Sequence, residues 1–385
     1  MRCLDVERLK RNIESRIGAD VESGRVGCAA VAVRQDGQLL YEGFFGCSDL
    51  RNAPLRKDAI YRIASMTKPI TAVAVLKLVE EGKLSLDTRV DRYLPEYGHL
   101  RAVRQNSAGD LMLGEEIRTP VTLWHLLTHT SGIGGGSIGS AQMRLMSEEQ
   151  RSSLDQAVSY YAGAGLQFEP GSAVLYSGVP AFDVAAAVVE KVTDRPYEDF
   201  LKEHIFVPCR MKDTTFSPTA EQWERMVTVH DYVNGQAVVG ETHAGCVFVD
   251  LPTTHPLGGA GLISTLDDYS NFAEMLLRGG CFEGNRVLTE KSVRLMATPQ
   301  VSHALQPKPK RWGLAVKVVT DESYGRLPVG AFGWSGAYGT HFWVDPANRI
   351  TAVYMKNSHY DSGGDAVTAN NFEEDVTAAL AKERL

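Results

Sequence analysis

The chain has few cysteines, and they form no metal-binding or redox motif. Its 385 residues include six of them, and no two stand in the Cys-x-x-Cys arrangement of zinc ribbons and thioredoxin-like proteins. The N-terminal segment 1–8 is charged and contains no secretory apolar core. We therefore expect free thiols in a reducing compartment and a cytoplasmic protein, although the even number of cysteines leaves a disulfide open. The cysteines are Cys3, Cys28, Cys47, Cys209, Cys246 and Cys281.

The sequence also lacks a long apolar run and an excess of positive charge. The apolar stretches at 29–33 and 184–189 are far shorter than the roughly 20 residues that a membrane-spanning helix needs. The net charge is −7, whereas nucleic acids and anionic membrane surfaces are bound by basic patches. We expect neither a nucleic acid nor a membrane as a partner. None of these patterns bears on the oligomeric state.

Internal repeats and low-complexity linkers are absent as well, and strand patterns occur near both ends of the chain. Leu9, Ile13, Ile17 and Val21 recur every four residues and predict a first helix, and a last amphipathic helix is predicted through 367–380. Another helix begins after Thr265, which has the character of a capping residue, and ends at Gly279–Gly280. Extended segments are predicted at 28–34, 39–45, 312–320, 330–334, 340–344 and 350–357, with turns at 35–37 and 345–348.

This order of elements predicts an α/β fold of the α+β type in a single unit spanning residues 1–385. An antiparallel sheet built from both termini would be flanked by helices and would carry an inserted helical lobe. The sheet lobe would comprise approximately 1–64 and 255–385, and the mainly helical lobe approximately 65–254. A cleft between two such lobes is a natural place for a site.

Ser65 and Lys68 form the only Ser-x-x-Lys motif of the chain. A short extended segment precedes the motif, and an apolar helical pattern that ends at Gly82 follows it. Residues three apart share a helical face, so the amine of Lys68 can reach the hydroxyl of Ser65. A serine hydroxyl becomes nucleophilic when a base takes its proton, and a lysine can be that base if its pKa falls from about 10.4 to roughly 7–8. The alternative is an exposed helix start with no chemical role.

Two further segments offer groups that acyl transfer requires. Tyr176, placed after a Pro-Gly turn, is a candidate to protonate the leaving group and activate water, although alone such a tyrosine is more often a packed aromatic. The glycines in 333–339 indicate close approach of a backbone or a ligand to a strand. There the amide of Ala337, with the amide of Ser65, could hold an oxyanion. The alternative is a glycine-rich bulge.

Taken together, these motifs resemble those of the class C β-lactamases and penicillin-binding-protein-like serine hydrolases. The resemblance implies that Ser65 is the acylated nucleophile and that Lys68 assists its deprotonation. It also implies that Tyr176 is the partner acid/base and that Ala337 gives the second oxyanion amide. The segments that carry it, in family order, are 61–68, 125–132, 168–171 before Tyr176-Ser177, 258–265 and Trp334-Ser335-Gly336.

Two departures from the β-lactamase pattern bear on the substrate. Gly178 stands where that pattern has the asparagine of Tyr-x-Asn, and Trp334 replaces the lysine of Lys-Thr-Gly that binds a substrate carboxylate. Losing such a charge-assisted hydrogen bond costs roughly 1.5–3 kcal/mol. The Trp-Ser-Gly version resembles the esterase and acyltransferase branch, which acts on uncharged esters. We expect Trp334, Ser335, Gly336 and Gly178 to bind the substrate.

Three other signals carry less weight. The segment 135–139 matches Gly-x-Ser-x-Gly around Ser137, but we expect it in a glycine-rich loop, without the strand and helix that a nucleophile elbow needs. His125 and His129 have i, i+4 spacing, yet no third ligand is in view, and capping or core packing is favoured over metal. His341 follows the Trp334 strand and could contact the substrate, although as a base it is a poor second to Lys68.

The sequence therefore predicts a serine hydrolase that forms an acyl-Ser65 intermediate. We expect a carboxylesterase or acyltransferase acting on a small-molecule ester or amide, with no metal or organic cofactor. The alternative enzyme is a β-lactamase or a D-Ala-D-Ala peptidase. The alternative from another class is a non-catalytic binding module with the same fold.

Overall fold

The chain is centred on a seven-stranded antiparallel sheet to which both ends of the sequence contribute. The computed structural model describes residues 1–240, 255–364 and 366–381. In the sheet the strand order is β11-β12-β13-β14-β15-β1-β2, so the last strand pairs with the first, with Ala30 opposite Met355. The predicted fold class is confirmed. The strands are β1 (Cys28–Gln35), β2 (Gln38–Gly46), β11 (Lys310–Trp312), β12 (Lys317–Val319), β13 (Phe332–Ser335), β14 (His341–Asp345) and β15 (Ile350–Met355).

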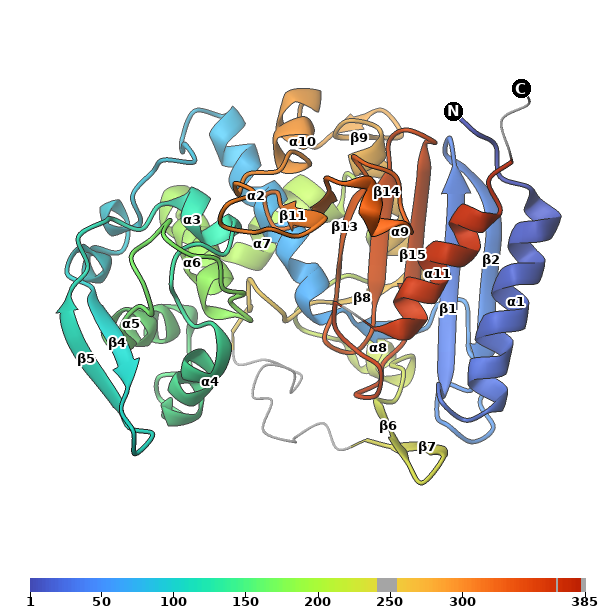
Figure 1. Ribbon diagram of the computed structural model, residues 1–385, viewed down its shortest axis with the longest axis horizontal. Coiled ribbons are helices and arrows are strands. Elements are labelled where there is room, and N and C mark those ends of the chain that lie inside the picture. The colour runs from blue at the N-terminus through green and yellow to red at the C-terminus, as the bar shows by residue number, and fades with distance from the viewer. Residues whose placement is uncertain (241–254, 365, 382–385) are drawn as a thin grey trace.

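Helices cover both faces of this sheet (Figure 1). The terminal helices α1 (Val6–Glu22) and α11 (Val367–Ala378) cover one face, and α9 (Leu266–Leu277) packs on β14 and β15 from the other. Alternate residues of β1 enter different cores: Val31 joins the cluster under α1 and α11, and Ala32 joins the cluster that includes α9. A strand buried on both faces has no polar alternation, which explains the continuous apolar run in the sequence.

Two predictions about the C-terminal elements are wrong in detail. Segment 312–320 is not one strand but parts of β11 and β12, because the chain turns between them at Gly313–Val316. Ala315 has a positive φ of 62° there, and its amide donates to Leu127 O at 2.8 Å. The last helix ends at Ala378, so Leu380 lies beyond it. The helix after Thr265 has its predicted cap, since the Thr265 side chain accepts from the Asp268 amide.

The middle of the chain contains helices, and it also contains two hairpins that the sequence patterns did not indicate. The hairpins are β4 (Arg101–Gln105) with β5 (Leu111–Glu116), and β6 (His230–Val233) with β7 (Gln236–Val239). In the first hairpin the Asn106 side chain accepts from two amides of its own turn, which fixes the reversal. The other helices are α2 (Thr67–Glu80), α3 (Leu123–Leu127), α4 (Gly136–Leu145), α5 (Leu154–Ala164), α6 (Pro180–Thr193), α7 (Tyr197–Leu201), α8 (Ala220–Glu224) and α10 (Glu290–Met296).

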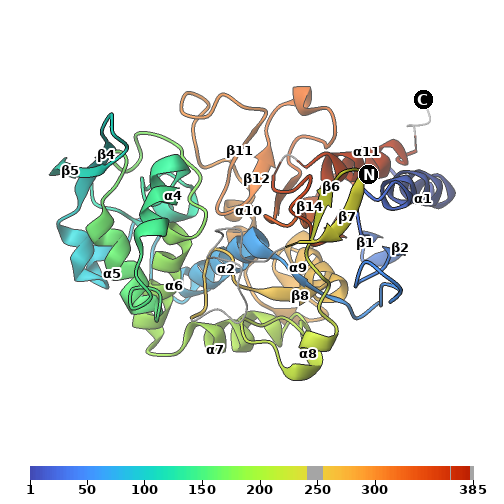
Figure 2. The same cartoon turned by 90° about the horizontal axis from the view of Figure 1, so that it is seen from below.

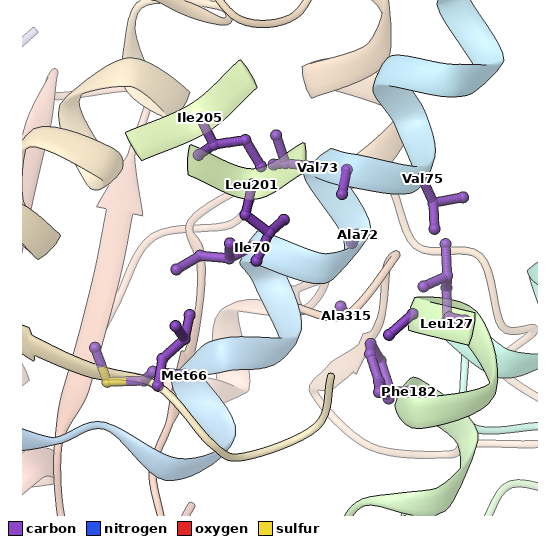
Figure 3. Close-up of a cluster of buried hydrophobic side chains, with 14 of the residues drawn as sticks. Met66, Ile70, Ala72, Val73, Val75, Leu127, Phe182, Leu201, Ile205 and Ala315 are labelled. Carbon is purple, nitrogen blue, oxygen red and sulfur yellow. The ribbon is translucent and has the colours of Figure 1, made fainter. Parts of the chain in front are cut away.

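Helix α2 runs through the middle of the molecule, with α6 on one side and α9 on the other (Figure 2). Ile70 and Val73 lie toward Leu201 and Ile205, while Phe182 lies on the other side of the helix (Figure 3). Almost every residue of α2 is buried, so the helix cannot shift without disturbing the main core. The start of α2 is therefore a rigid position.

The described residues contain no helix of the length and apolar character that crossing a membrane requires. Five cysteines are free thiols, and Cys246 lies outside the described residues.

Candidate active site

Ser65 lies in a 3₁₀ turn, Ala64–Met66, between the short strand β3 (Ile60–Arg62) and α2. Its position is set from two sides. Strand β3 pairs with β8 (Ile263–Thr265), and the Asn357 side chain bonds both backbone groups of Arg62, accepting from its amide and donating to its carbonyl at 3.0 Å each. The strand that leads to Ser65 is thereby hydrogen-bonded to the segment that follows β15. As predicted, the motif stands at a helix start, with Ser65 just before the α-helix and Lys68 in its first turn.

The amine of Lys68 is completely buried and has three polar neighbours. Its Nζ lies 3.2 Å from Ser65 Oγ, 2.5 Å from Gly178 O and 2.7 Å from Gly259 O. Burial lowers the pKa of Lys68, against the smaller opposing effects of Tyr176 and Asp183. A neutral amine has two N–H groups and one lone pair. The two carbonyls can take both N–H groups, which leaves the lone pair for the Ser65 hydroxyl.

Tyr176 reaches the same oxygen from another direction. Its hydroxyl donates to Ser65 Oγ at 2.7 Å, so Ser65 Oγ contacts both proton-handling candidates. The tyrosine ring is held among other aromatic rings. It lies parallel to Trp312, with the centroids 6.0 Å apart, and its centroid is 4.6 Å from that of His129. Trp334 completes the aromatic surroundings at 5.4 Å.

His129 fixes the backbone that carries Tyr176. Its Nδ1 accepts from the Ser177 amide at 3.1 Å, and its carbonyl accepts from the Leu175 amide at 3.0 Å. Burial holds the pKa of His129 well below its ordinary value, so the ring is neutral. His125 caps α3 together with Thr122. Capping and core packing, the favoured alternative to a metal site, are therefore what the two histidines do.

Sequence reasoning missed the part that His129 and Trp312 play around Tyr176. His129 lies within the family segment 125–132, but its spacing from His125 indicates only capping or core packing. Trp312 stands at a strand end, where nothing in the local pattern indicates that its ring reaches Tyr176.

The Ala337 turn follows β13 and lies against the segment that leads to Ser65. The Gly336 amide donates to Thr340 O at 2.7 Å, and Thr340 Oγ1 donates to Ile63 O at 3.2 Å. A Cβ on Gly336 would lie 2.4 Å from Ile63 O, so only glycine permits this approach. Ala337 itself is exposed at the tip of the turn.

Trp334 and Gly178, the two departures from the β-lactamase pattern, both belong to this site. The indole N–H of Trp334 is buried and has no hydrogen-bond partner among the described residues. Gly178 contributes its carbonyl to Lys68, and a Cβ built on it would meet no described atom within 4 Å. An apolar ring thus occupies the position where the pattern has a cation.

Ser335 and His341 are buried on the sheet, with 4% and 6% of their surface exposed. Ser335 Oγ lies 2.8 Å from His341 Nδ1, and His341 Nε2 lies 3.2 Å from Glu373 Oε1 on α11. A direct contact of these two side chains with a substrate stays a prediction. Their hydrogen bonds favour a part in fixing β13.

The prediction that Ser137 lies in a loop is wrong. Ser137 lies in the first turn of α4, because Gly136, with its positive φ of 56°, lets the helix begin there. It is exposed, and no named strand leads into it. The nucleophile-elbow geometry is therefore missing around Ser137. The described residues also contain no cluster of three or more histidine, cysteine or acidic side chains that could hold a metal ion.

The family model for β-lactamases matches residues 13–374 of this chain. The chain belongs to the β-lactamase family. The resemblance read from the motifs is thus confirmed, and so is the expectation of an enzyme of the serine hydrolase type.

Curated relatives of this β-lactamase-family chain align over nearly its whole length. The Rv1367c protein of Mycobacterium tuberculosis is 33% identical over 372 residues, which are 90% of each chain. Esterase EstB of Burkholderia gladioli is 30% identical over 383 residues, 93% of each chain. A solved structure of EstCE1, described as a hydrolase with promiscuous acyltransferase activity, has a TM-score of 0.80 at 23% identity and covers 96% of this chain and 99% of its own. That structural likeness establishes the shared fold.

Proposed function

We propose that this protein is a carboxylesterase, or an acyltransferase, that acts on small uncharged esters through an acyl-Ser65 intermediate. The observation that carries the proposal is that Ser65 Oγ contacts both the buried amine of Lys68 and the hydroxyl of Tyr176, while Trp334 takes the place of a carboxylate-binding lysine. The 30% identity to an esterase over nearly the full length supports the same reading.

Acylation starts with attack of Ser65 Oγ on the ester carbonyl carbon. The hydroxyl proton passes to the lone pair of Lys68, and the amides of Ser65 and Ala337 hold the negative oxygen of the tetrahedral intermediate. The alcohol leaves with a proton that Tyr176 delivers and regains from Lys68. Water, or a second alcohol, then attacks the acyl-Ser65 carbonyl carbon and gives up its proton to the same pair. The pair returns a proton to Ser65 Oγ as the bond between this oxygen and the acyl carbon breaks, which restores the serine and releases the acid or a new ester.

Trp334 supports the choice of an uncharged substrate. Penicillins and D-Ala-D-Ala peptides carry a carboxylate, and an indole provides apolar surface and one N–H donor but no positive charge. We infer that Trp334 and the open space beside Gly178 line the part of the site that receives the acyl or alcohol group. Hydrolysis of β-lactams or D-Ala-D-Ala peptides is the second candidate, and the departures at these two positions disfavour it.

Two serine variants test the nucleophile. Ser65→Ala should lower the hydrolysis of a nitrophenyl ester by roughly a thousandfold or more and abolish labelling by a fluorophosphonate. Ser137→Ala, the matched control, should keep both near the wild-type level because its hydroxyl is exposed at the start of α4. An active Ser65 variant together with an inactive Ser137 variant would contradict the assignment.

Intact mass distinguishes the substrate classes. The wild type is incubated with a short-chain nitrophenyl ester and, separately, with a penicillin. An acyl adduct from the ester and none from the penicillin is the expected result. A stable penicilloyl adduct would favour the penicillin-recognising alternative, and no turnover of either compound would favour a binding module.

A further inference from the structure

Asn357 is a buried polar residue beside the site that the reaction outlined above does not use. It has no exposed surface, so it cannot touch a substrate. Its side chain accepts from the Arg62 amide and donates to the Arg62 carbonyl, at 3.0 Å each, and Arg62 stands three residues before Ser65. One side chain thus satisfies both backbone groups of the residue that ends β3, as a neighbouring strand would.

The next residue, Ser358, holds the turn that carries Ala337. Its amide donates to Tyr338 O at 2.9 Å, and Tyr338 directly follows Ala337. Two consecutive residues therefore hold the two halves of the proposed oxyanion hole. Asn357 bonds the backbone that leads to Ser65, and Ser358 bonds the turn around Ala337.

The segment that contains Asn357 is itself fixed from two sides. On one side it continues β15, whose last residue, Met355, pairs with Ala30 of β1. On the other side it runs along the start of β6: Asn357 O accepts from His230 N at 3.0 Å, and His359 N donates to His230 O at 2.9 Å. The segment can therefore serve as a rigid support for the two halves.

The two halves also contact each other directly. Ala64, the residue before Ser65, packs with Tyr338 and Val229 in a small buried cluster. Ala64 has a positive φ of 44°, a conformation that persists in a residue other than glycine only where its surroundings hold it. The direction of the peptide group that carries the Ser65 amide thus depends on the fit between these two halves.

We propose that Asn357 is a positioning residue for the oxyanion hole: it fixes the backbone before Ser65 against the segment that also holds the Ala337 turn. In this way it sets the separation of the Ser65 and Ala337 amides. The inference rests on the proposed acyl-Ser65 function. Two amides stabilise a tetrahedral intermediate only when both point to the place where the negative oxygen forms. Loss of the Asn357 side chain would displace one of them while Lys68 and Tyr176 remain.

Asn357→Ala tests the positioning with two esters that have the same nitrophenol leaving group. One is a nitrophenyl ester, and the other is its thionoester, in which sulfur replaces the carbonyl oxygen. Sulfur is a weak hydrogen-bond acceptor, so the thionoester gains little from the two amides. The kcat/KM for the ester should fall by roughly thirtyfold and that for the thionoester by about threefold, so their ratio should fall by about tenfold.

A purely structural role of Asn357 would leave this ratio unchanged, because a smaller folded fraction lowers both rates equally. Asn348→Ala is the matched control. Asn348 is also a buried asparagine, but its side chain donates to Asp345 Oδ2 at 2.7 Å in the turn between β14 and β15, at the other end of β15. Its ratio should equal that of the wild type.

Asn357→Ser is the second variant, and it decides the matter if Asn357→Ala does not fold. Its shorter side chain cannot bond both backbone groups of Arg62, while its hydroxyl leaves a polar partner for a water molecule. An unchanged ratio in the folded Asn357 variant would overturn the inference, even if both rates had fallen. Ser65→Ala separates the cases: if it is inactive on both esters while the ratio stays unchanged, only the inference fails, and if it is active, the proposed function fails.

Discussion

At the scale of single residues, Lys68 and Tyr176 contact one oxygen atom, Ser65 Oγ, at 3.2 and 2.7 Å. Both contacts are fixed by the surrounding structure. Lys68 is hydrogen-bonded to two carbonyls, and Tyr176 is enclosed by aromatic rings. Two groups that share one proton route act as a unit, and the effects of removing them do not multiply.

Lys68→Ala and Tyr176→Phe should each lower kcat for a nitrophenyl ester by roughly a hundredfold or more. The double variant should lose far less than the product of the two single losses. The measurement is a double-mutant cycle: steady-state kinetics on the wild type, the two single variants and the double variant. Fully multiplicative losses would show that the two residues work in separate steps.

The second prediction for single residues concerns Trp334 and Gly178, which we expect to determine the choice between esters and β-lactams. The wild type should hydrolyse a nitrophenyl ester readily and nitrocefin weakly or not at all. Trp334→Lys, alone or with Gly178→Asn, should raise nitrocefin acylation relative to ester turnover by roughly tenfold, since one charged hydrogen bond contributes about 1.5–3 kcal/mol. An asparagine at 178 meets no described atom within 4 Å of its Cβ, so the second change introduces no clash there.

Trp334→Phe is the matched control, because it removes the indole N–H without adding a charge. Its ratio of nitrocefin to ester turnover should not rise. Fast nitrocefin turnover by the wild type, or an unchanged ratio after the lysine is restored, would overturn the substrate assignment and leave the Ser65 chemistry standing.

How far the sequence predicts these residues depends on how local their interactions are. The contact between Ser65 and Lys68 follows from i, i+3 spacing, so the motif alone indicates it. The other two partners of Lys68 are the carbonyls of Gly178 and Gly259, and a backbone carbonyl has no sequence signature.

At the scale of elements, most of the predicted helices and strands hold, and the single extended segment predicted at 312–320 does not. Helix α1 has a strong four-residue pattern and the β1–β2 hairpin has a turn signal at 35–37, and both lie where the sequence predicts them. Strands β11 and β12 are three residues each, and a tertiary bond from the Ala315 amide to Leu127 O helps to fix the turn between them. A local sequence pattern does not separate two such short strands, so it indicates one extended segment.

Helix α11 is joined to the sheet by a buried carboxylate, Glu373. It accepts from Tyr324 OH at 2.6 Å and Arg326 Nε at 3.0 Å, and it faces His341 on β14. Burial alone would raise the pKa of this carboxyl, but hydrogen bonds and charges from His341, Lys310 and Tyr324 together lower it to about 2. A lowered pKa means that the ionised form stabilises the folded state, and that this stabilisation is lost as the pH falls from 4.5 toward 2.

Glu373→Gln should therefore lower the free energy of unfolding by about 3 kcal/mol at pH 7 and by roughly half as much at pH 3. Urea unfolding at the two pH values measures both differences. Glu374→Gln, the exposed neighbour on the same helix, should have little effect at either pH. A loss for Glu373→Gln that does not shrink at pH 3 would mean that packing, not charge, explains its contribution.

At the scale of the whole molecule, the two ends of the chain lie together at one side, and the elements from β4 to α6 lie at the opposite side (Figure 1). Asp5 N donates to Ala379 O and Ala381 N donates to Cys3 O, both at 2.9 Å, so the first and last segments close on each other. Side-chain hydrogen bonds, as well as chain connections, join the two predicted lobes, which are 1–64 with 255–385 and 65–254. Trp124 Nε1 donates to Gln300 Oε1 at 3.3 Å, and Tyr269 OH donates to Met66 O at 2.8 Å.

These contacts lead us to propose that the two lobes unfold as one cooperative unit. Helix α2 belongs by sequence to the helical lobe. Its first turn nevertheless forms part of the site that β13 and β8 complete. We therefore expect that neither lobe keeps a closed core without the other. Hydrogen-exchange mass spectrometry over a urea series tests this: peptides from α6 and from β1 should lose protection at the same urea concentration, at which ester hydrolysis also disappears. If peptides of α5 and α6 exchanged at lower urea while β1 and β15 stayed protected, the lobes would be independent folding units, and the bonds between them, such as that of Trp124 to Gln300, would contribute little to stability.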